Sequence, residues 1–474
     1  MSQGSYAPVT DEVVRELAAI VGERFVITDR EKLEPYSHDE VAEVAYASLP
    51  EVVVKPGTAE EVAGIVQLAN RRLIPVTPRG AGSGLSGGAV PVCGGIVLAT
   101  DRMNRILEID EQNMMAVVEP GVVTNDINEQ VARLGLFYAG YPMSLETCYI
   151  GGNVAENAGG GKAIKYGVTE RYVLGLQVVT PTGEIVELGG KRLKDVTGYN
   201  LVKLMVGSEG TLGVITRITL RLLPLPKAQV ALLVPFPDVE SAVAAVPKVM
   251  TQGGTIPTAI EFMDRLSVQA SCQYLNEQLP YEQSGAMLLL EVDGSDEETV
   301  RRDYETIGEL CLQNGAQEVY VADNHTTRER LWRIRRNIAE AFKVISPDQS
   351  IEDVVVPTAA IPRLMPELAR ISEEYGVQIP CYGHAGDGNL HATVVKAPGD
   401  SMEEWRRKLP DILNDLYVGT RKLGGTISGE HGIGSKRKKF MRLVLGDAEL
   451  ELMRKIKRAL DPNDILNPGK IFDV

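Results

Sequence analysis

Three of the five histidines in this 474-residue chain lie in two short glycine-rich segments near its C-terminus. The first segment, Gly383–His391, reads GHAGDGNLH, and the second, Ile427–Gly434, reads ISGEHGIG. The turn signal Ala-Gly-Asp-Gly separates His384 from His391, so the chain can fold back and bring the two imidazoles together. With Glu430 as a third ligand, this set suits Zn²⁺, Fe²⁺ or Mn²⁺ and leaves positions open for a substrate. The alternative is a pair of turn histidines that hydrogen-bond to the backbone.

Three glycine-rich stretches in the first half of the chain indicate a second kind of chemistry, the binding of an anion by backbone N–H groups. They are PRGAGSGLSGG (Pro78–Gly88), YPMSLETCYIGGNVAENAGGG (Tyr141–Gly161) and VGSEGTLGVIT (Val206–Thr216). Glycine-rich loops form concave sets of donors that favour a pyrophosphate, and the second stretch adds hydroxyls and amides. Each stretch alone is also typical of a surface turn. One extended cofactor accounts for all three better than unrelated connections do, since ordinary loops are short.

The elements that must position the first glycine stretch form a β-α-β unit. Glu51–Lys55 predicts a strand, Thr58–Glu61 matches a capping box that starts a helix, and Ile74–Thr77 predicts a second strand. Gly82, Gly84 and Gly87 satisfy G-x-G-x-x-G, but a Rossmann dinucleotide site needs a helix directly after that motif. The continuation AVPVCGG is poor helix material, so the Rossmann interpretation fails.

The rest of the chain predicts alternating strands and helices. A helix capped by Thr124 is expected to end at Gly135. After Pro224 the density of glycine loops falls, and residues 227–380 read as an α+β cap domain. Its expected strands are 228–234 and 286–292, and its expected helices are about 238–251, 296–313 and 360–375.

Composition excludes several classes of function. A net charge of −15 argues against a partner that is held through phosphate contacts, such as a nucleic acid. The chain has no apolar run long enough for a membrane span and no signal-peptide pattern, so we expect a cytoplasmic protein. The five cysteines are widely spaced without a C-x-x-C, which is consistent with a reducing compartment and provides no spacing for an iron–sulfur cluster.

Together, the three glycine stretches resemble the flavin-binding domain of the vanillyl-alcohol-oxidase superfamily. From about residue 8 onward the whole chain resembles its D-2-hydroxy-acid branch, which includes the glycolate oxidase flavin subunit, D-lactate dehydrogenase and D-2-hydroxyglutarate dehydrogenase. The resemblance implies an α+β fold with a two-subdomain FAD-binding domain. It also implies an N-terminal helical segment (1–45), the FAD-binding domain (46–225), a substrate cap domain (226–425) and a C-terminal segment returning to the flavin (426–474).

The resemblance implies non-covalent FAD, because none of the five histidines lies between Arg79 and Gly213. It places the first glycine stretch on the pyrophosphate, the second along the ribityl and ring side, the third at the adenine end, and Asn467 near the ring. The implied FAD-binding residues are Pro78, Arg79, Gly80, Ala81, Gly82, Ser83, Gly84, Ser86, Gly87, Gly88, Pro142, Ser144, Thr147, Gly151, Gly152, Asn153, Asn157, Gly213, Ile215 and Asn467.

The same resemblance implies a divalent metal at His384, His391 and Glu430, with His431 as the base that deprotonates the substrate. The helix LWRIRRN resembles the family's Trp-x-x-Arg helix and points to Arg335 as the binder of the substrate carboxylate. Its arginines are also compatible with a solvated helix face. Ile351 aligns where D-2-hydroxyglutarate dehydrogenases carry a lysine, which favours a small or apolar substrate tail, as in glycolate or D-lactate.

Two questions about partners and function remain open at this level. The absence of cysteine clusters suggests electron transfer to a partner, either an iron–sulfur subunit or an electron-transfer flavoprotein, through which the protein would associate peripherally with a membrane. The basic run Lys436–Lys439 reads as a solvated helix start or as a docking patch for such a partner. The rival function is that of a non-redox transferase like alkylglycerone-phosphate synthase, which shares the flavin fold.

Overall fold

The computed structural model describes residues 6–41 and 46–474 and divides into two compact units. The first unit contains Met1–Gly159, Val168–Leu225 and Glu430–Val474, and the second contains Gly160–Gly167 and Pro226–Gly429. Residues 1–5 and 42–45, which belong to the predicted N-terminal segment 1–45, lie outside the described residues. The boundaries predicted at 45, 225 and 425 stay predictions, which limited proteolysis would test.

The first unit opens with a four-stranded sheet of order β1-β2-β4-β3. Its strands are β1 (Val26–Ile27), β2 (Val52–Val54), β4 (Ile96–Ala99) and β3 (Val76–Arg79), and α3 (Ala59–Arg72) connects β2 to β3. The predicted helix start is confirmed, because the Glu61 N–H donates to the hydroxyl of the N-cap residue Thr58; the Glu61 carboxylate accepts from the Gly57 N–H instead of the Thr58 N–H, so the reciprocal half of the capping box is absent. β2 and β3 both run parallel to β4, which lies between them. Residues 80–95 contain no helix, in agreement with the rejection of a Rossmann site.

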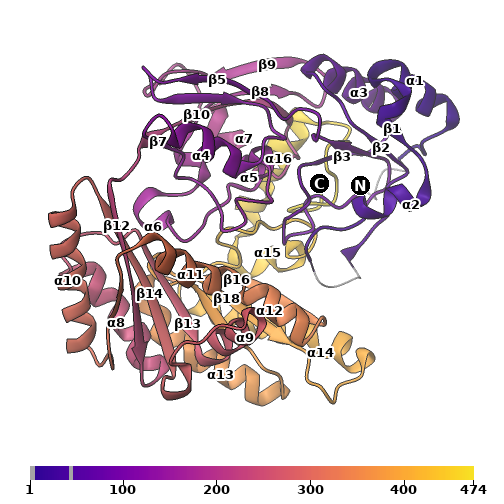
Figure 1. Cartoon of the computed structure of the whole chain (residues 1–474). Coiled ribbons are helices and arrows are strands. Elements are labelled where there is room, and N and C mark those ends of the chain that lie inside the picture. The colour runs from indigo at the N-terminus through magenta and orange to yellow at the C-terminus, as the bar shows by residue number, and fades with distance from the viewer. Residues whose placement is uncertain (1–5, 42–45) are drawn as a thin grey trace. The chain divides into compact units, whose positions relative to one another are not determined.

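A five-stranded antiparallel sheet of order β5-β6-β10-β8-β9 forms the other layer of this unit (Figure 1). Its strands are β5 (Ile106–Asp110), β6 (Met115–Val118), β10 (Val214–Arg221), β8 (Val173–Val179) and β9 (Ile185–Gly189). A two-stranded pair joins β7 (Leu136–Phe137) to β11 (Leu223–Pro224). The other longer helices of the unit are α1 (Asp11–Val21), α4 (Thr124–Ala132) and α16 (Asp447–Leu460). The glycine-rich helix is α5 (Ile150–Glu156). The short helices are α2 (Arg30–Leu33), α7 (Leu201–Met205) and α15 (Met441–Val444).

The predicted cap of α4 is wrong by one residue. The N-cap position is Val123, and the Thr124 hydroxyl lies buried against the Cys148 carbonyl at 3.5 Å and accepts a hydrogen bond from the Asn153 amide. Thr124 therefore joins α4 to the second glycine stretch instead of capping the helix.

The C-terminal segment adds an extended piece beside β3. The Val76 N–H donates to the Ile465 carbonyl, and the Asn467 N–H donates back to the Val76 carbonyl, both at 2.8 Å. The Tyr6 hydroxyl also donates to the Asp464 carbonyl at 2.8 Å, so residues near both ends of the chain meet at this edge (Figure 1). The last residues of the chain thereby come to the base of the first glycine stretch, which begins inside β3.

The second unit is built on one seven-stranded antiparallel sheet of order β15-β12-β14-β13-β17-β18-β16. The strands are β15 (Tyr320–Ala322), β12 (Ala228–Phe236), β14 (Ala286–Gly294), β13 (Ala259–Asp264), β17 (Cys381–His384), β18 (Asn389–Val395) and β16 (Gln349–Val355). The helices are α6 (Ala163–Tyr166), α8 (Val239–Gln252), α9 (Arg265–Leu275), α10 (Glu297–Gln313), α11 (His325–Arg336), α12 (Ile338–Ile345), α13 (Ile361–Tyr375) and α14 (Met402–Lys422). The predicted strands β12 and β14 and helices α8, α10 and α13 are confirmed to within two residues.

The two faces of this sheet differ sharply in polarity, because successive side chains of a strand point to opposite sides. One face carries apolar residues such as Phe262, Leu288 and Leu390, all 0% exposed, and packs against α8, α10 and α14. The strand register places ionisable and polar side chains on the other face, which we call the polar face. Its members are Glu291 and Asp293 of β14, Glu261 of β13, Tyr382 and His384 of β17, Asn389, His391 and Thr393 of β18, and Ile351 and Asp353 of β16.

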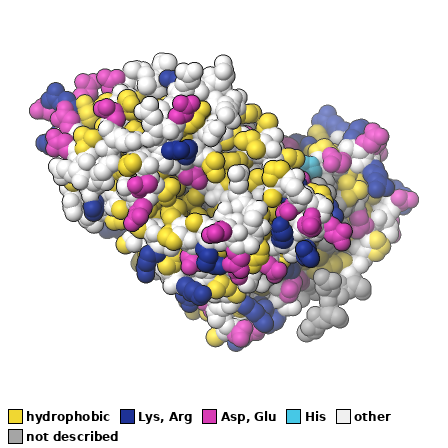
Figure 2. Space-filling model, turned by 90° about the horizontal axis from the view of Figure 1, so that it is seen from below, with side chains coloured by type: hydrophobic (Ala, Val, Ile, Leu, Met, Phe, Trp, Pro, Cys, Tyr) yellow, Lys and Arg dark blue, Asp and Glu magenta, His cyan; other side chains and the backbone are white. Residues whose placement is uncertain are grey.

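None of the helices in the described part of the chain combines the length and hydropathy that crossing a bilayer requires. On the face of the molecule shown in Figure 2, lysine and arginine side chains are interspersed with aspartate and glutamate side chains.

Candidate functional site

A groove in the first unit lies where the glycine stretches meet, between the end of β3, the start of α5 and the start of β10. Its cavity volume is about 90 Å³, and the groove is open to solvent. Residues from all three stretches line it: Pro78, Arg79, Gly80, Gly88, Ala89, Thr100, Pro120, Gly151, Gly152, Ala155, Glu156, Glu209, Gly210, Gly213, Val214 and Ile215.

Gly152 leaves room for a ligand in this groove. A Cβ built on Gly152 would meet no protein atom within 4 Å, and one on Gly80 would make only ordinary contacts from 3.7 Å. Protein packing therefore does not require glycine at Gly152, although the residue lies inside α5, where alanine is intrinsically the better helix former. Close approach of a bound group to the backbone explains the glycine, as expected for the predicted FAD.

Replacement of Gly152 by alanine should weaken FAD binding without destabilising the fold. The added methyl group enters the groove, and overpacking of about 1–3 kcal/mol corresponds to a Kd for FAD raised roughly 10- to 100-fold. The unfolding temperature of the FAD-free protein should stay constant or rise, since helix interiors favour alanine over glycine by about 0.5–1 kcal/mol. Fluorescence titration with FAD and thermal unfolding measure the two effects. Gly446→Ala is the control, because its Cβ is equally unobstructed but Gly446 does not line the groove. An unchanged FAD affinity would show that the groove holds something else.

Several predicted FAD-binding residues use their polar groups within the protein. The Arg79 guanidinium donates to the carbonyls of His38, Ala89 and Pro35. The Gly87 N–H donates to Asp39 at 2.7 Å, and the Gly88 N–H donates to the Ser86 hydroxyl. Backbone atoms of this stretch thus line the groove, while its longest side chain anchors the stretch to residues 35–38.

Some residues of the second glycine stretch line the groove, and others lie on the protein surface. Asn153 is buried and donates to Thr124 at 2.7 Å, and Asn157 ends α5 in the left-handed region and accepts from the Glu170 N–H. Ser144 and Thr147 are exposed and belong to one turn, in which the Thr147 hydroxyl donates to the Ser144 carbonyl. The predicted residues outside the groove lining are Ala81, Gly82, Ser83, Gly84, Ser86, Gly87, Pro142, Ser144, Thr147, Asn153, Asn157 and Asn467.

Two buried carboxylates in the groove wall, Glu156 and Glu209, were missed in the sequence. Burial and, next, the charge of Glu209 raise the pKa of Glu156 well above its usual range. Burial also raises the pKa of Glu209, whose carboxylate accepts from the Ile433 and Gly434 N–H groups at 2.8 and 2.7 Å. Glu209 therefore fixes the loop that follows His431.

Glu156 should make the protein less stable at alkaline pH, and Glu156→Gln should remove that effect. A carboxyl whose pKa is raised in the folded state contributes its stability below the unfolded-state pKa and loses it as the pH rises through the folded-state pKa. The glutamine keeps an acceptor for the Ser86 hydroxyl and carries no charge. We expect the variant to be more stable than wild type by about 1–3 kcal/mol at pH 8, with the difference shrinking toward pH 5. Thermal unfolding measured from pH 5 to pH 8 tests this expectation, with the exposed Glu146→Gln as control. If the stability of wild type and of Glu156→Gln changed with pH in the same way, the raised pKa of Glu156 would be refuted.

The C-terminal segment meets the groove wall through Asn467. Its side-chain amide donates to the carbonyls of Gly88 and Glu209 at 2.9 and 2.7 Å.

The basic run Lys436–Lys439 is not a uniform surface patch, because Lys436 and Arg437 are buried and Arg437 donates to the Leu85 and Gly432 carbonyls. The expectation of a fully solvated helix start is therefore wrong.

In the second unit, the β17–β18 hairpin brings the two predicted metal-binding histidines onto the polar face. The rings of His384 and His391 lie 5.5 Å apart between centroids and are nearly perpendicular, and their ligand nitrogens lie within 4.8 Å of one another. Both side chains are buried, at 2% and 6% exposure. Two imidazoles so close in a buried place form part of the donor set that a divalent transition metal prefers.

Glu261 of β13 contacts both His384 and Arg335 and was also missed in the sequence. Its Oε1 lies 2.7 Å from His384 Nδ1, and its Oε2 lies 2.6 Å from Arg335 Nε. Burial raises the pKa of Glu261, but the charges of His384 and Arg335 outweigh that effect and hold it at about 2. An ionised carboxylate therefore joins a predicted metal ligand to the predicted binder of the substrate carboxylate.

Asp353 of β16 fixes the segment that leads to the last two predicted residues. It accepts from the Asn389 amide at 2.7 Å and from the Ser428 hydroxyl and the Gly429 N–H, both at 2.8 Å. Glu430 is the next residue in the chain after Gly429. Glu430 and His431 themselves belong to the first unit, where His431 Nε2 lies 3.7 Å from Glu430 Oε1.

The arginines of α11 separate into two groups. Arg330 and Arg333 are exposed, and both pair with Glu277 at 2.7 Å. These two arginines therefore form the solvated helix face that was the alternative interpretation. Arg335 is 3% exposed and points to Glu261, with its guanidinium carbon 5.2 Å from the centre of the Tyr382 ring. Only Arg335 of these three can meet a substrate over the polar face.

The short segment 160–167 closes over the β14 part of the polar face. Lys162 pairs with Glu291 at 2.9 Å, and the Trp332 indole N–H donates to the same carboxylate at 2.6 Å. Lys165 pairs with Asp293, which also accepts from the Tyr166 hydroxyl. These two acids are therefore neutralised by the lysines of this segment.

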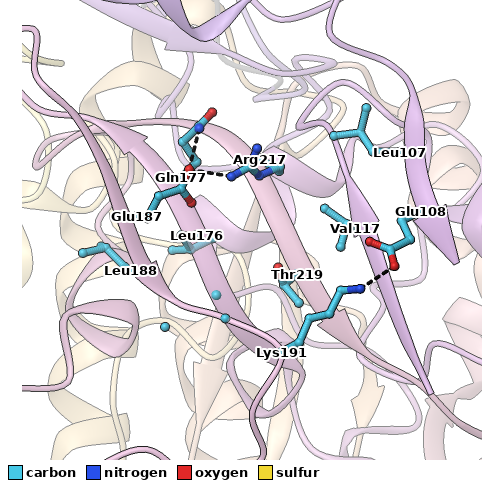
Figure 3. A pocket seen from close by; sticks show the side chains of 13 residues that line it. Leu107, Glu108, Val117, Leu176, Gln177, Glu187, Leu188, Lys191, Arg217 and Thr219 are labelled. Atoms are coloured by element: carbon cyan, nitrogen blue, oxygen red, sulfur yellow. Dashed lines mark hydrogen bonds and ion pairs between the residues drawn. The ribbon is translucent and has the colours of Figure 1, made fainter. Parts of the chain in front are cut away.

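A further hollow lies on the outer face of the five-stranded sheet of the first unit (Figure 3). Its charged side chains pair with one another: Lys191 with Glu108, and Arg217 with Glu187. Much of the remaining lining of the hollow is apolar and consists of Leu107, Val117, Leu176 and Leu188. Nothing in it converges on a reacting group, so we place the chemistry elsewhere.

Comparison with known proteins identifies two families along the chain. The FAD binding domain family matches residues 50–189, and the family of FAD linked oxidases, C-terminal domain, matches residues 225–471. The chain is 39% identical to D-lactate dehydrogenase of Anaerostipes hadrus, covering 99% of both chains. It is 38% identical to glycolate oxidase subunit GlcD of Bacillus subtilis, covering 98% of this chain and 97% of that protein. The solved structure of p-cresol methylhydroxylase is similar at a TM-score of 0.80 and 20% identity, covering 98% and 97%, which shows the shared fold.

Proposed function

We propose that this chain, which belongs to the FAD-linked oxidases, oxidises a small D-2-hydroxy acid to the 2-oxo acid. The observation that carries the proposal is the polar face, where His384 and His391 are buried beside each other on neighbouring strands and the buried Arg335 of α11 points to Glu261 of the same face. The names of the whole-length relatives, D-lactate dehydrogenase and a glycolate oxidase subunit, give the substrate class. Steady-state assays with an artificial electron acceptor and glycolate, D-lactate, L-lactate or D-2-hydroxyglutarate test it; activity with none of these acids would refute it.

The residues fit the two groups that this reaction needs. The groove with Gly80 and Gly152 in its wall accommodates FAD, which when bound accepts the hydride that leaves C2 of the substrate. His384 and His391, with Glu430 as the third ligand, would hold a divalent Zn, Fe or Mn ion. Such an ion lowers the pKa of a bound hydroxyl group.

The chain's own residues supply orientation and proton transfer. Arg335 binds the substrate carboxylate through its buried guanidinium, which fixes C2 relative to the cofactor. His431 accepts the C2 hydroxyl proton on an imidazole nitrogen, the side-chain group that serves most often as a general base. The substrate thus loses one proton and one hydride and becomes the 2-oxo acid. Ile351 on the polar face is apolar and 6% exposed, which favours a short substrate tail such as that of glycolate or D-lactate.

Arg335→Lys should raise KM for the acid and lower kcat/KM by roughly 10- to 100-fold. A hydrogen bond to a charged group contributes about 1.5–3 kcal/mol, and lysine cannot reproduce the bidentate geometry. Arg333→Lys is the matched control, because Arg333 lies on the same helix but is exposed and paired with Glu277. Equal kinetics for the two variants would exclude Arg335 from the substrate site.

We further propose that electrons pass from the flavin to a partner protein, an iron–sulfur subunit or an electron-transfer flavoprotein. All five cysteines are unpaired, and four of them are buried singly, so the chain carries no cysteine-ligated relay of its own. A cytoplasmic location, with membrane association only through such a partner, follows from this proposal. Co-purification of a second redox polypeptide with the tagged protein tests it.

A further inference from the structure

Glu261 is an unusual residue for its position. It lies in the middle of β13 between the apolar residues Ile260 and Phe262, and it is 0% exposed. A carboxylate in such a place is costly unless cations or donors compensate it. Both of its oxygens are compensated, Oε1 by His384 and Oε2 by Arg335. The two compensating groups are the same two that the proposed function needs on this face.

We propose that Glu261 is a positioning residue that holds His384 and Arg335 in their working orientations at the same time. This inference rests on the proposed function, since it assigns a role toward the metal and the substrate carboxylate. Glu261 contacts neither of them in this account; it acts through the two side chains it binds. One strand carboxylate thereby couples the geometry of metal binding to that of substrate binding.

The contact with His384 determines which ring nitrogen is available. An ionised carboxylate only accepts hydrogen bonds, so the hydrogen of the imidazole lies on Nδ1. The lone pair of the neutral ring is then on Nε2, which is the atom that can bind a cation. Metal-binding histidines generally donate their other ring N–H to a carboxylate or carbonyl in this way, and loss of that partner typically costs 10- to 100-fold in metal affinity.

The contact with Arg335 determines where the guanidinium presents its remaining donors. Because Nε is held 2.6 Å from Glu261, the terminal nitrogens extend beyond that carboxylate. Within the described part of the chain, Nε and Nη2 of Arg335 are both buried without a hydrogen-bond partner, because the close ion pair of Nε with Glu261 Oε2 does not have hydrogen-bond geometry. A buried donor left in this state is costly, and a substrate carboxylate would satisfy it.

Glu291 provides a matched control on the same face. It is also a strand glutamate, 3% exposed, but its partners are Trp332 and Lys162 instead of His384 and Arg335. Glu261→Gln and Glu291→Gln therefore remove the same charge from the same sheet, and only the first change touches the proposed site. In Glu261→Gln the amide oxygen can still accept from one partner, whereas the amide nitrogen places a donor against the other.

The test uses FAD-loaded protein from which bound metal has been stripped. Mn²⁺ affinity is measured by electron paramagnetic resonance titration, and KM and kcat for D-lactate are measured after Mn²⁺ is restored. We expect Glu261→Gln to weaken Mn²⁺ binding 10- to 100-fold and to raise KM, while Glu291→Gln stays within about twofold of wild type in both. Wild-type Mn²⁺ affinity in Glu261→Gln, or equal losses in the two variants, would overturn the positioning role.

Failure of the proposed function gives a different result from failure of this inference. If the wild-type protein binds no Mn²⁺, the metal site itself is refuted, and the inference falls with it. If the wild type binds Mn²⁺ and Glu261→Gln is unaffected, the metal site stands and only the role of Glu261 is lost. If Glu261→Gln does not fold, Glu261→Asp keeps the charge but is one methylene too short to hold both partners, and wild-type Mn²⁺ affinity in that variant overturns the inference.

Discussion

Replacement of His431 by alanine should abolish turnover while the purified protein stays yellow. His431 follows Glu430 in the loop that Glu209 holds through the Ile433 and Gly434 N–H groups, so the loop should persist without the imidazole. General-base catalysis contributes about 10²- to 10⁴-fold, and kcat for the hydroxy acid should fall by that factor. Absorbance spectra report the FAD content, and stopped-flow flavin reduction reports the chemical step.

His325→Ala is the control for this experiment, because His325 is exposed at the start of α11 and outside both centres. It should reduce flavin at the wild-type rate. A colourless His431→Ala protein would mean that His431 anchors the cofactor and is not the base. An unchanged rate of flavin reduction would exclude it from catalysis altogether.

The second large effect is expected for His391→Ala. This substitution removes one of two buried imidazoles whose ligand nitrogens lie within 4.8 Å of one another, leaving too few donors for tight binding of a divalent ion. A metal's contribution of several kcal/mol to charge stabilisation corresponds to a loss of about 10³-fold or more in kcat/KM. Elemental analysis should show the variant without the ion that the wild-type protein carries, and added Mn²⁺ or Zn²⁺ should not restore turnover.

Treatment of the wild-type protein with a chelator is the companion measurement. It should reproduce the kinetic loss of His391→Ala and, unlike the substitution, be reversed by restoring the metal. Full activity in chelator-treated, demonstrably metal-free protein would mean that the two histidines serve the reaction without an ion.

Sequence patterns predicted the elements that local chemistry determines. The helix start capped by Thr58 and the strands and helices with regular apolar periodicity lie close to where they were expected, because neighbouring residues suffice to define them. The exclusion of a Rossmann site also follows from local sequence, since residues 80–95 cannot form a helix. The FAD-binding fold was predicted from the resemblance of three glycine stretches to those of a known family, because together these stretches are highly specific.

The missed residues are those whose importance comes from partners distant in sequence. Glu261 meets His384 across 123 positions and Glu209 meets Ile433 across 224, and no local pattern reports either pairing. A signal was available nonetheless. Glu261 and Glu291 each stand among apolar residues of a buried strand, and charged residues are almost never fully buried unless they are paired.

Other expectations were limited by competing tertiary contacts. Thr124 has the right type for a helix cap, but its hydroxyl serves the buried Asn153 instead. Arg437 belongs to a run of four basic residues typical of a solvated face, yet it is fully buried on two backbone carbonyls. In both cases a segment distant in sequence supplies the hydrogen-bond partner. The residue type indicates that the side chain needs such a partner, but the neighbouring residues do not indicate which one it has.

The central claim is that the chain transfers a hydride from a 2-hydroxy acid to its own FAD. Anaerobic titration of the purified protein with D-lactate or glycolate tests this most directly, because it needs no electron acceptor or partner. We predict that the oxidised flavin band is bleached by one equivalent of the acid, with formation of one equivalent of the 2-oxo acid. A flavin that stays oxidised with every acid in the panel, in protein that holds its FAD and its metal, would contradict the account.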